Sequence, residues 1–266
     1  MRVAKKVPIT RFPDAAAVTY SRAIRKMVLE LGNETLKQFE KNVEPLLNES
    51  RQDSKEFVVD GILDNIKRML KAVKSKADKI FSEIKIHSTA QKFVYNINLF
   101  NKHNVENQLA VRGINPTQRE PWLETFIISR INDNVGYIRN IEDDYLDQIR
   151  NVVQDGVTEG RSTRQIRESI LERVDVAESR AQFIAVDQAG SILGQMNAER
   201  HQQIGIDKFK WLTSQDERVR DSHKVLSDKI FSYDDPPTVN GRTVLPGEDY
   251  RCRCVAIPVF DDEESD

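Results

Sequence analysis

The chain of 266 residues has little cysteine and no long apolar run. It holds two cysteines, and the single residue between Cys252 and Cys254 places them poorly for a bridge to each other. No stretch of 18 apolar residues occurs, and residues 1–8 are basic without an apolar run. We therefore expect no membrane partner and no secretory signal, and a protein of a reducing cytoplasm or of a particle assembled there.

Charge of both signs is abundant but unevenly distributed. Lys and Arg total 40 against 42 Asp and Glu, for a formal net charge of -2. Basic residues outnumber acidic ones by 20 to 13 in residues 1–110, whereas acidic residues lead by 29 to 20 in residues 111–266. This asymmetry is typical of a protein with differently charged partners at its two ends, and it also falls within ordinary surface variation.

Apolar residues recur at the 3–4 spacing of amphipathic helices over most of the chain, as in the stripe from Ile62 to Phe81. This spacing predicts a mainly α fold, an elongated bundle of long helices with a small C-terminal α+β module rich in turns. Gly32 predicts a weak interruption within the first helical region. Two later helices are expected to begin at the capping boxes Ser162-x-x-Gln165 and Asp175-x-x-Glu178.

We expect four regions along the chain. They are an N-terminal helical region (1–115), a second helical region (116–205), a compact α+β module (206–259) and an acidic disordered tail (260–266). The module is expected to contain strands over about 209–212 and 252–259, separated by a short helix and by turn signals such as Asn240-Gly241.

Six basic residues follow the polar side of the predicted helix over residues 53–84. They could attract DNA phosphates, although a solvated helix surface is the favoured interpretation because no aromatic residue interleaves with them to stack bases. The six are Lys67, Arg68, Lys71, Lys74, Lys76 and Lys79.

The candidate metal ligands are His223, Cys252 and Cys254. A Cys-x-Cys on a strand directs both thiols to one face, and two thiolates with an imidazole suit zinc, with Asp216 or Asp221 as a candidate fourth ligand. Because the spacing is shorter than in standard zinc sites, two buried thiols are the favoured alternative. A third alternative is catalysis by Cys252 with His223 as its base, but no glycine-rich oxyanion turn is evident.

Other polar residues of the module have structural interpretations. Asp216 and Arg220 are four residues apart, so a salt bridge that fixes the turn around His223 is expected. Trp211 is expected to anchor a small core, with an exposed partner-binding role as the alternative. Arg251 and Arg253 alternate with the cysteines, so they are expected on the opposite face, against solvent, phosphate or an acidic partner.

From Arg180 onward the chain resembles the Mu F-like head morphogenesis family of tailed phages, the phage minor head proteins. The resembling segments are RAQFIAVDQAG from Arg180, KWLTSQDERVRDSH from Lys210 and PGEDYRCRC from Pro246. The resemblance covers roughly residues 120–259, and it departs from the family pattern at Ala185-Val186-Asp187-Gln188. The ordered motif residues are Trp211, Asp216, Arg220, His223, Pro246, Gly247, Cys252, Arg253 and Cys254.

The resemblance implies a minor capsid protein that joins the procapsid, contacts the portal and influences DNA packaging or ejection. We therefore expect a structural protein and not an enzyme, with the portal protein as partner and the major capsid or scaffolding protein and packaged DNA as further candidates. Its expected place is the phage head interior or portal vertex, after assembly in the host cytoplasm. Only 12 residues follow Cys254, too few for the toxin-like domain of some relatives. The alternatives are a DNA-binding factor inside the head and a Cys/His-dependent enzyme.

Overall fold

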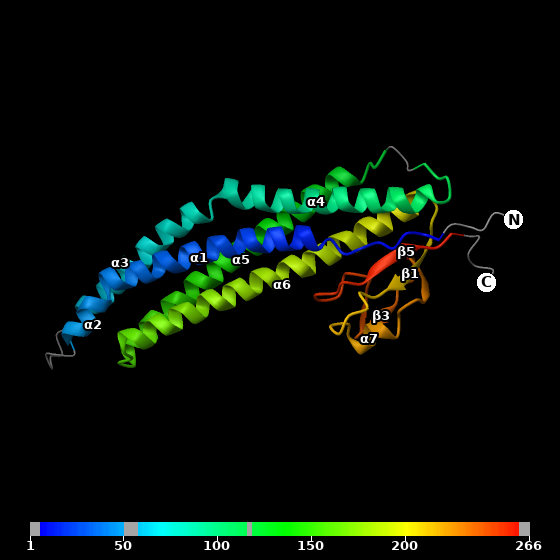
Figure 1. The fold of residues 1–266 in the computed structure, drawn as a ribbon. Helices are drawn as coiled ribbons and strands as arrows, with labels where there is room; N and C mark the ends of the chain where they lie inside the picture. The colour runs from blue at the N-terminus through cyan, green and yellow to red at the C-terminus, as the bar shows by residue number, and fades with distance from the viewer. Residues whose placement is uncertain (1–5, 51–57, 116–118, 261–266) are drawn as a thin grey trace. The chain divides into compact units, whose positions relative to one another are not determined.

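The computed structural model describes residues 6–50, 58–115 and 119–260 of the chain (Figure 1). Contacts divide it into two compact units. The first contains the described parts of residues 1–20, 90–133 and 183–266, and the second contains those of 21–89 and 134–182. The four predicted regions follow chain order, whereas each unit joins segments that lie far apart along the chain, and the predicted boundaries stay predictions. Of the predicted tail, Phe260 is buried and residues 261–266 lie outside the described part.

Long helices make up most of the described chain, with short strands confined to its C-terminal part, so the predicted mainly α fold class is confirmed. Among the described residues, every helix is too short or too polar to cross a bilayer. The helices are α1 (Asp14–Asn42), α2 (Glu44–Ser50), α3 (Val58–Ile80), α4 (Glu83–Ala110), α5 (Leu123–Thr158), α6 (Thr163–Gln203) and α7 (Asp221–Lys224). The first residues of the helix predicted from residue 53 lie outside the described part.

Helix α1 runs unbroken through Gly32, so the predicted interruption there is wrong. A Cβ at Gly32 would lie 2.6 Å from the Cγ2 atom of Val174 in α6. The glycine therefore allows two helices of the second unit to pack closely, and it does not end a helix.

One of the two predicted capping boxes begins a helix. The Oε1 atom of Gln165 accepts the backbone N–H of Ser162 at 2.8 Å, and the Oγ atom of Ser162 accepts the N–H of Gln165 at 3.2 Å, at the start of α6. Asp175 lies exposed in the middle of the same helix, and Glu178 pairs with Arg25 of α1 at 2.9 Å. The predicted helix start at Asp175 is therefore wrong, because the acidic side chain of its box serves an inter-helix contact.

The apolar stripe of α3 lies in the core of the second unit, as its periodicity predicts. Ile66, Met69, Val73 and Ala77 each expose 1% of their surface or less. Full burial of such a side chain stabilises the fold by about 1.5–3 kcal/mol for the larger ones. This burial fixes which face of α3 its basic residues must occupy.

A small antiparallel sheet forms the C-terminal part of the first unit. Its strands lie in the order β2 (Ile230–Ser232), β1 (Lys208–Leu212), β5 (Val255–Pro258). A separate hairpin pairs β3 (Thr238–Val239) with β4 (Arg242–Thr243) around Asn240-Gly241, where φ is 51° and 79°. These positive φ values are those of the tight hairpin turn that the Asn-Gly signal predicts.

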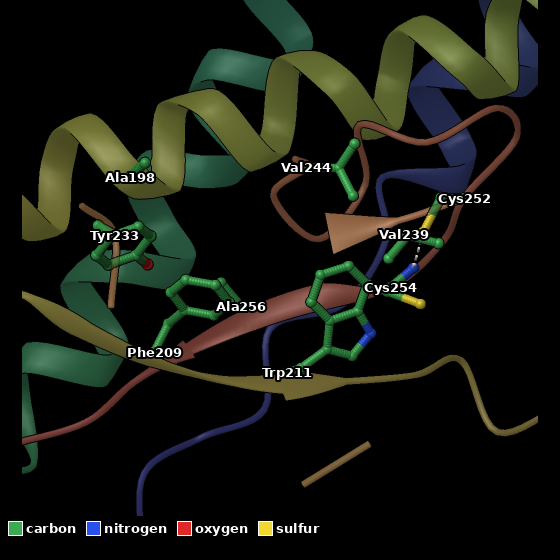
Figure 2. Packing of buried hydrophobic residues seen from close by; sticks show 9 residues of the cluster. All are labelled: Ala198, Phe209, Trp211, Tyr233, Val239, Val244, Cys252, Cys254 and Ala256. Atoms are coloured by element: carbon green, nitrogen blue, oxygen red, sulfur yellow. Dashed lines mark hydrogen bonds between the residues drawn. The ribbon is translucent and has the colours of Figure 1, made fainter. Parts of the chain in front are cut away.

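Side chains from this sheet and from α6 enclose one apolar core (Figure 2). Phe209 and Trp211 of β1 are fully buried and pack with Ala198 of α6 and Ala256 of β5. The predicted anchoring role of Trp211 in a small core therefore matches its position. Because α6 supplies part of this core, the sheet depends on the helix for its stability.

A buried histidine joins α6 to the segment that follows β2. The Nδ1 atom of His201 lies 2.6 Å from the hydroxyl oxygen of Tyr233, and both residues are buried. Burial, aided by the charge of Arg200, lowers the pKa of His201 to about 3. The imidazole is therefore neutral in the folded protein at physiological pH.

Acidification is expected to destabilise the protein through His201. In the unfolded chain this residue takes up a proton below about pH 6.5, whereas the folded form resists protonation until about pH 3. The stabilisation is therefore complete above pH 6.5 and is lost progressively as the pH falls toward 3. Urea unfolding should show a fall of about 1 kcal/mol between pH 7.0 and 5.5 that the variant His201→Gln lacks. An equal fall in both proteins would contradict this assignment.

Candidate functional site

Residues 245–254, here called the cysteine segment, lie against α6 at two glycines. A Cβ at Gly190 would lie 2.6 Å from the carbonyl oxygens of both Gly247 and Cys252, and a Cβ at Gly194 would collide with another carbonyl oxygen of the segment. Only glycine lets a helix and a second backbone approach this closely. The spacing of four residues places both glycines on one face of α6, so they form a single docking surface.

The colliding carbonyl at Gly194 belongs to Pro246, the first residue of the buried Pro-Gly turn. Gly247 has a φ of 101°, a conformation that L side chains rarely adopt. The turn therefore needs glycine for its own conformation as well as for its contact with α6.

Polar side chains of α6 hold the same segment. Asp187 accepts the backbone N–H of Arg251 at 3.0 Å, and burial raises the pKa of this carboxyl. Gln195 donates to Glu248 at 2.9 Å, and the second oxygen of Glu248 accepts the N–H of Leu245 at 2.8 Å. Asp187 occupies the stretch where the helix departs from the family pattern, and in this chain it anchors the backbone next to Cys252.

The structure brings His223, Cys252 and Cys254 together as a buried group. The Sγ atoms of Cys252 and Cys254 lie 3.4 Å and 3.5 Å from the Nδ1 atom of His223, and the ligand atoms of all three residues lie within 4.8 Å of one another. The predicted placement of both cysteines on a strand is wrong, because β5 begins at Val255. They converge on one side because the docked segment turns before it enters the sheet.

The imidazole of His223 is oriented from its other nitrogen. The Nε2 atom lies 3.0 Å from the Oδ2 atom of Asp249, a buried carboxylate. Arg220 and Arg242 approach the oxygens of Asp249 at 3.2 Å and 3.8 Å. As a carboxylate, Asp249 accepts the hydrogen bond of the Nε2–H group, which leaves the Nδ1 lone pair facing the sulfurs.

Coupling between the two thiols separates their acidities. A hydrogen bond from Cys254 lowers the pKa of Cys252 to about 5, and the same contact together with burial raises the pKa of Cys254. The contact with Cys252 also raises the pKa of His223. The contact between the two sulfurs therefore favours the thiolate at Cys252 over the thiolate at Cys254.

Trp211 covers the group from the sheet. Its ring meets that of His223 edge-on, with centroids 5.7 Å apart. Figure 2 shows the indole nitrogen directed toward the Cys254 sulfur, and this N–H favours the thiolate of Cys254. No hydrogen bond of good geometry satisfies the indole N–H among the described residues.

Asp216 and Arg220 take different partners, so their predicted salt bridge is wrong. Asp216 pairs with Arg253, which lowers the pKa of the carboxyl against the effect of burial. Arg220 pairs with Asp249 and donates to the carbonyl of Tyr250. Each therefore fastens the cysteine segment. Residues 216–220 form a bend and a turn and not a helix, so the i, i+4 pairing of a helix does not form.

The two candidate fourth ligands lie elsewhere. Asp216 is engaged by Arg253, and Asp221 is exposed and pairs with Lys224 at 2.8 Å. Arg251 is exposed, and its guanidinium lies 5.7 Å from the ring of Phe183. The described residues therefore supply three ligands and no fourth.

The basic residues of α3 are all exposed, in the second unit, far along the chain from the cysteine segment. Three of them are neutralised. Lys67 pairs with Asp64 at 3.2 Å, Lys76 pairs with Glu34 at 3.6 Å, and Lys74 pairs with Asp78 and with Glu142. Arg68, Lys71 and Lys79 are the exposed remainder, a smaller charge than the sequence pattern suggests.

The residues that position the site were not predicted from the sequence. Gly190 and Gly194 form a small-x-x-x-small pattern, a spacing that signals close approach of another backbone. Asp249 belongs to the motif PGEDYRC but had no predicted role, and no sequence pattern pointed to Arg242. Their roles depend on contacts between segments that only folding brings together.

A long helix that docks a turn-rich, cysteine-bearing segment through two glycines defines the class: a mainly helical protein with a small sheet held on its last long helix. Residues 147–257 match the family described as Phage Mu protein F like protein. This stretch of the chain is thus Mu F-like, and the resemblance drawn from the sequence is confirmed.

Three curated relatives match parts of the chain. An uncharacterised protein of Haemophilus influenzae is 34% identical over 161 residues, which is 60% of this chain and 35% of that protein. A protein of Enterococcus faecalis named NAD(+)–arginine ADP-ribosyltransferase EFV is 30% identical over 130 residues, or 45% of this chain and 27% of its own length. An uncharacterised protein of Methanocaldococcus jannaschii is 31% identical over 123 residues, or 46% and 19%.

The chain thus spans about a third of the length of these relatives or less. No solved structure matches it.

Adding a methyl group at either docking glycine is expected to destabilise the protein. Gly190→Ala and Gly194→Ala should each lower the free energy of unfolding by about 1–3 kcal/mol, because the methyl group meets backbone oxygens that cannot rotate away. The matched control is Gly136→Ala in α5, where nothing lies within 4 Å of the added carbon and helix propensity should give a small gain. Urea unfolding of the three variants measures the difference. If Gly190→Ala is as stable as Gly136→Ala, the close contact does not exist.

Proposed function

We propose that the protein is a structural minor head protein of a tailed bacteriophage, which associates with the portal in the procapsid and acts in head morphogenesis, DNA packaging or DNA ejection. The observation that carries the proposal is the family match over residues 147–257. That stretch includes all of α6 and the cysteine segment that docks on it. The proposed location is the head interior or portal vertex, after assembly in the host cytoplasm.

The geometry of the matched stretch supports a role that depends on shape. Its motif residues contact one another: Trp211 is in the core, Asp216 pairs with Arg253, and Arg220 fastens the cysteine segment. These contacts fix a rigid surface on the last long helix. A rigid surface of this kind is suited to docking against a partner of fixed geometry, such as a portal ring, and the capsid or scaffolding protein is a further candidate partner.

The proposal includes that the chain is not an enzyme. Cys252 and Cys254 each expose 3% of their surface, so a substrate would not reach either sulfur. A surface cavity of about 340 Å³ lies nearby between residues 9–14 and the end of β1, and its lining includes Asp216 and Arg253 but neither cysteine. The transferase named for the Enterococcus faecalis relative belongs to that protein, of which this chain matches 27%.

Association with the portal is the direct test. Full-length tagged protein, co-expressed with the portal protein of the same phage, is expected to retain the portal through purification. Mass spectrometry of purified particles should detect the chain at a copy number far below that of the major capsid protein. A matched co-expression with the major capsid protein shows whether retention is specific. Failure to retain the portal, together with absence from procapsids and virions, would refute the proposal.

The alternative of a DNA-binding factor rests on the basic residues of α3, half of which are engaged by carboxylates. We therefore expect the chain to bind duplex DNA weakly, with little dependence on salt. The charge-reversed pair Lys71→Glu, Lys79→Glu should bind like the control pair Lys92→Glu, Lys102→Glu from α4. A steep loss of affinity with added salt, reduced only in the α3 pair, would support the DNA-binding alternative instead.

A further inference from the structure

We propose that the Sγ atoms of Cys252 and Cys254 and the Nδ1 atom of His223 bind one zinc ion, which fastens α7 to the cysteine segment. This inference goes beyond the proposed role in the phage head and does not depend on it. It rests on the arrangement of the ligand atoms, on the groups that orient them and on the hydrogen-bond donors directed at the sulfurs.

The distances from the two sulfurs to Nδ1 of His223 suit a shared zinc ion. Zinc binds sulfur at about 2.3 Å and imidazole nitrogen at about 2.0–2.1 Å, so a tetrahedral angle separates the two ligand atoms by about 3.5 Å. The two sulfurs lie 3.4 Å and 3.5 Å from Nδ1 of His223. Both sulfur–nitrogen distances therefore match those of a zinc site, and all three ligand atoms lie within 4.8 Å of one another.

A single nitrogen, Nδ1 of His223, faces both sulfurs. An unprotonated Nδ1 has one lone pair, which can accept one S–H hydrogen bond along its direction. With two neutral thiols, only one can therefore donate to this nitrogen, and the Cys254 thiol donates instead to the sulfur of Cys252. One ion between the three atoms satisfies both sulfurs and the lone pair together.

The imidazole of His223 is held by a carboxylate at its second nitrogen. Asp249 contacts the Nε2 atom of His223 at 3.0 Å, and Arg220 contacts the same carboxylate oxygen at 3.2 Å. Metal-binding histidines commonly donate their second N–H to a carboxylate, which fixes the ring and increases the basicity of the ligand nitrogen. The arrangement of Asp249 is of this kind.

Hydrogen-bond donors are directed at both sulfurs. The backbone N–H of Cys254 donates to the Sγ atom of Cys252 at 3.4 Å, and the buried indole N–H of Trp211 is directed toward the Cys254 sulfur (Figure 2). Hydrogen-bond donors aimed at sulfur stabilise thiolates. Two thiolates, a neutral imidazole and a divalent ion sum to zero charge, which suits a buried place.

The ligand set selects zinc, and the place of the ligands in the fold gives the ion a structural role. Two thiolates and an imidazole favour zinc over the oxygen-preferring cations. Three protein ligands leave one position, which a water molecule can fill. Because His223 is in α7 and both cysteines precede β5, the ion would connect two segments of a small sheet module that has a limited core of its own.

Metal analysis of the full-length protein is the first test. Protein purified from zinc-supplied cells is expected to contain about one zinc per chain and to lose on the order of 10 °C in Tm on treatment with a strong chelator. Under native conditions, iodoacetamide should modify the two thiols after chelation but not before. A metal-free protein whose thiols resist iodoacetamide with and without chelator would establish buried thiols and overturn the proposal, as would stoichiometric iron or copper in place of zinc.

Cobalt substitution tests the ligands without relying on a variant that must fold. Metal-free protein titrated with Co²⁺ should develop the visible bands of a tetrahedral ion and a thiolate-to-cobalt band in the near ultraviolet. Cys252→Ser and His223→Gln should lose zinc, whereas the control His201→Gln, at a buried histidine that contacts Tyr233, should keep one zinc per chain. An octahedral cobalt spectrum without the thiolate band, or zinc retained by Cys252→Ser, would contradict the assigned ligands.

Discussion

The close approach of α6 to the cysteine segment is the constraint on which the C-terminal part of the structure depends. Carbonyl oxygens of the segment lie where side chains at Gly190 and Gly194 would be, so the helix face must be bare at both positions. Asp187 and Gln195 bind the segment on the same helix. Once the segment is held there, its two cysteines can reach His223.

The same constraint links backbone geometry to the chemistry of the site. Cys252 contributes a carbonyl oxygen to the contact with Gly190 and a sulfur to the group around His223. Asp249, which lies between Gly247 and Cys252 in the docked segment, orients the imidazole and is itself held by Arg220. The stability of the docked segment and the positions of the three ligand atoms therefore depend on the same contacts. A change that weakens the docking must also alter the geometry of these atoms.

The features that local sequence determines were predicted correctly. The buried stripe of α3, the box at Ser162 and the Asn240-Gly241 turn all lie within a few residues of their signals, and each has the structure expected. The errors at Gly32 and Asp175 have a common origin. A glycine or an acidic residue often marks a helix boundary. Here Gly32 makes room for the side chain of Val174, and Glu178 of the box at Asp175 pairs with Arg25. Likewise the grouping of His223 with the cysteines was expected, whereas Asp249 and the docking glycines depend on contacts far apart in the chain, which no local pattern reveals.

The proposed function requires a segment that is fixed on its helix before any partner binds. The most direct measurement of that property is native-state amide hydrogen exchange at Arg251 and Cys254, whose N–H groups are bonded to Asp187 and to the Cys252 sulfur. If the segment is fixed, both amides exchange no faster than the first unit unfolds. Exchange at the rate of a free surface loop would contradict it, because the segment would then be released while α6 and the sheet stay folded.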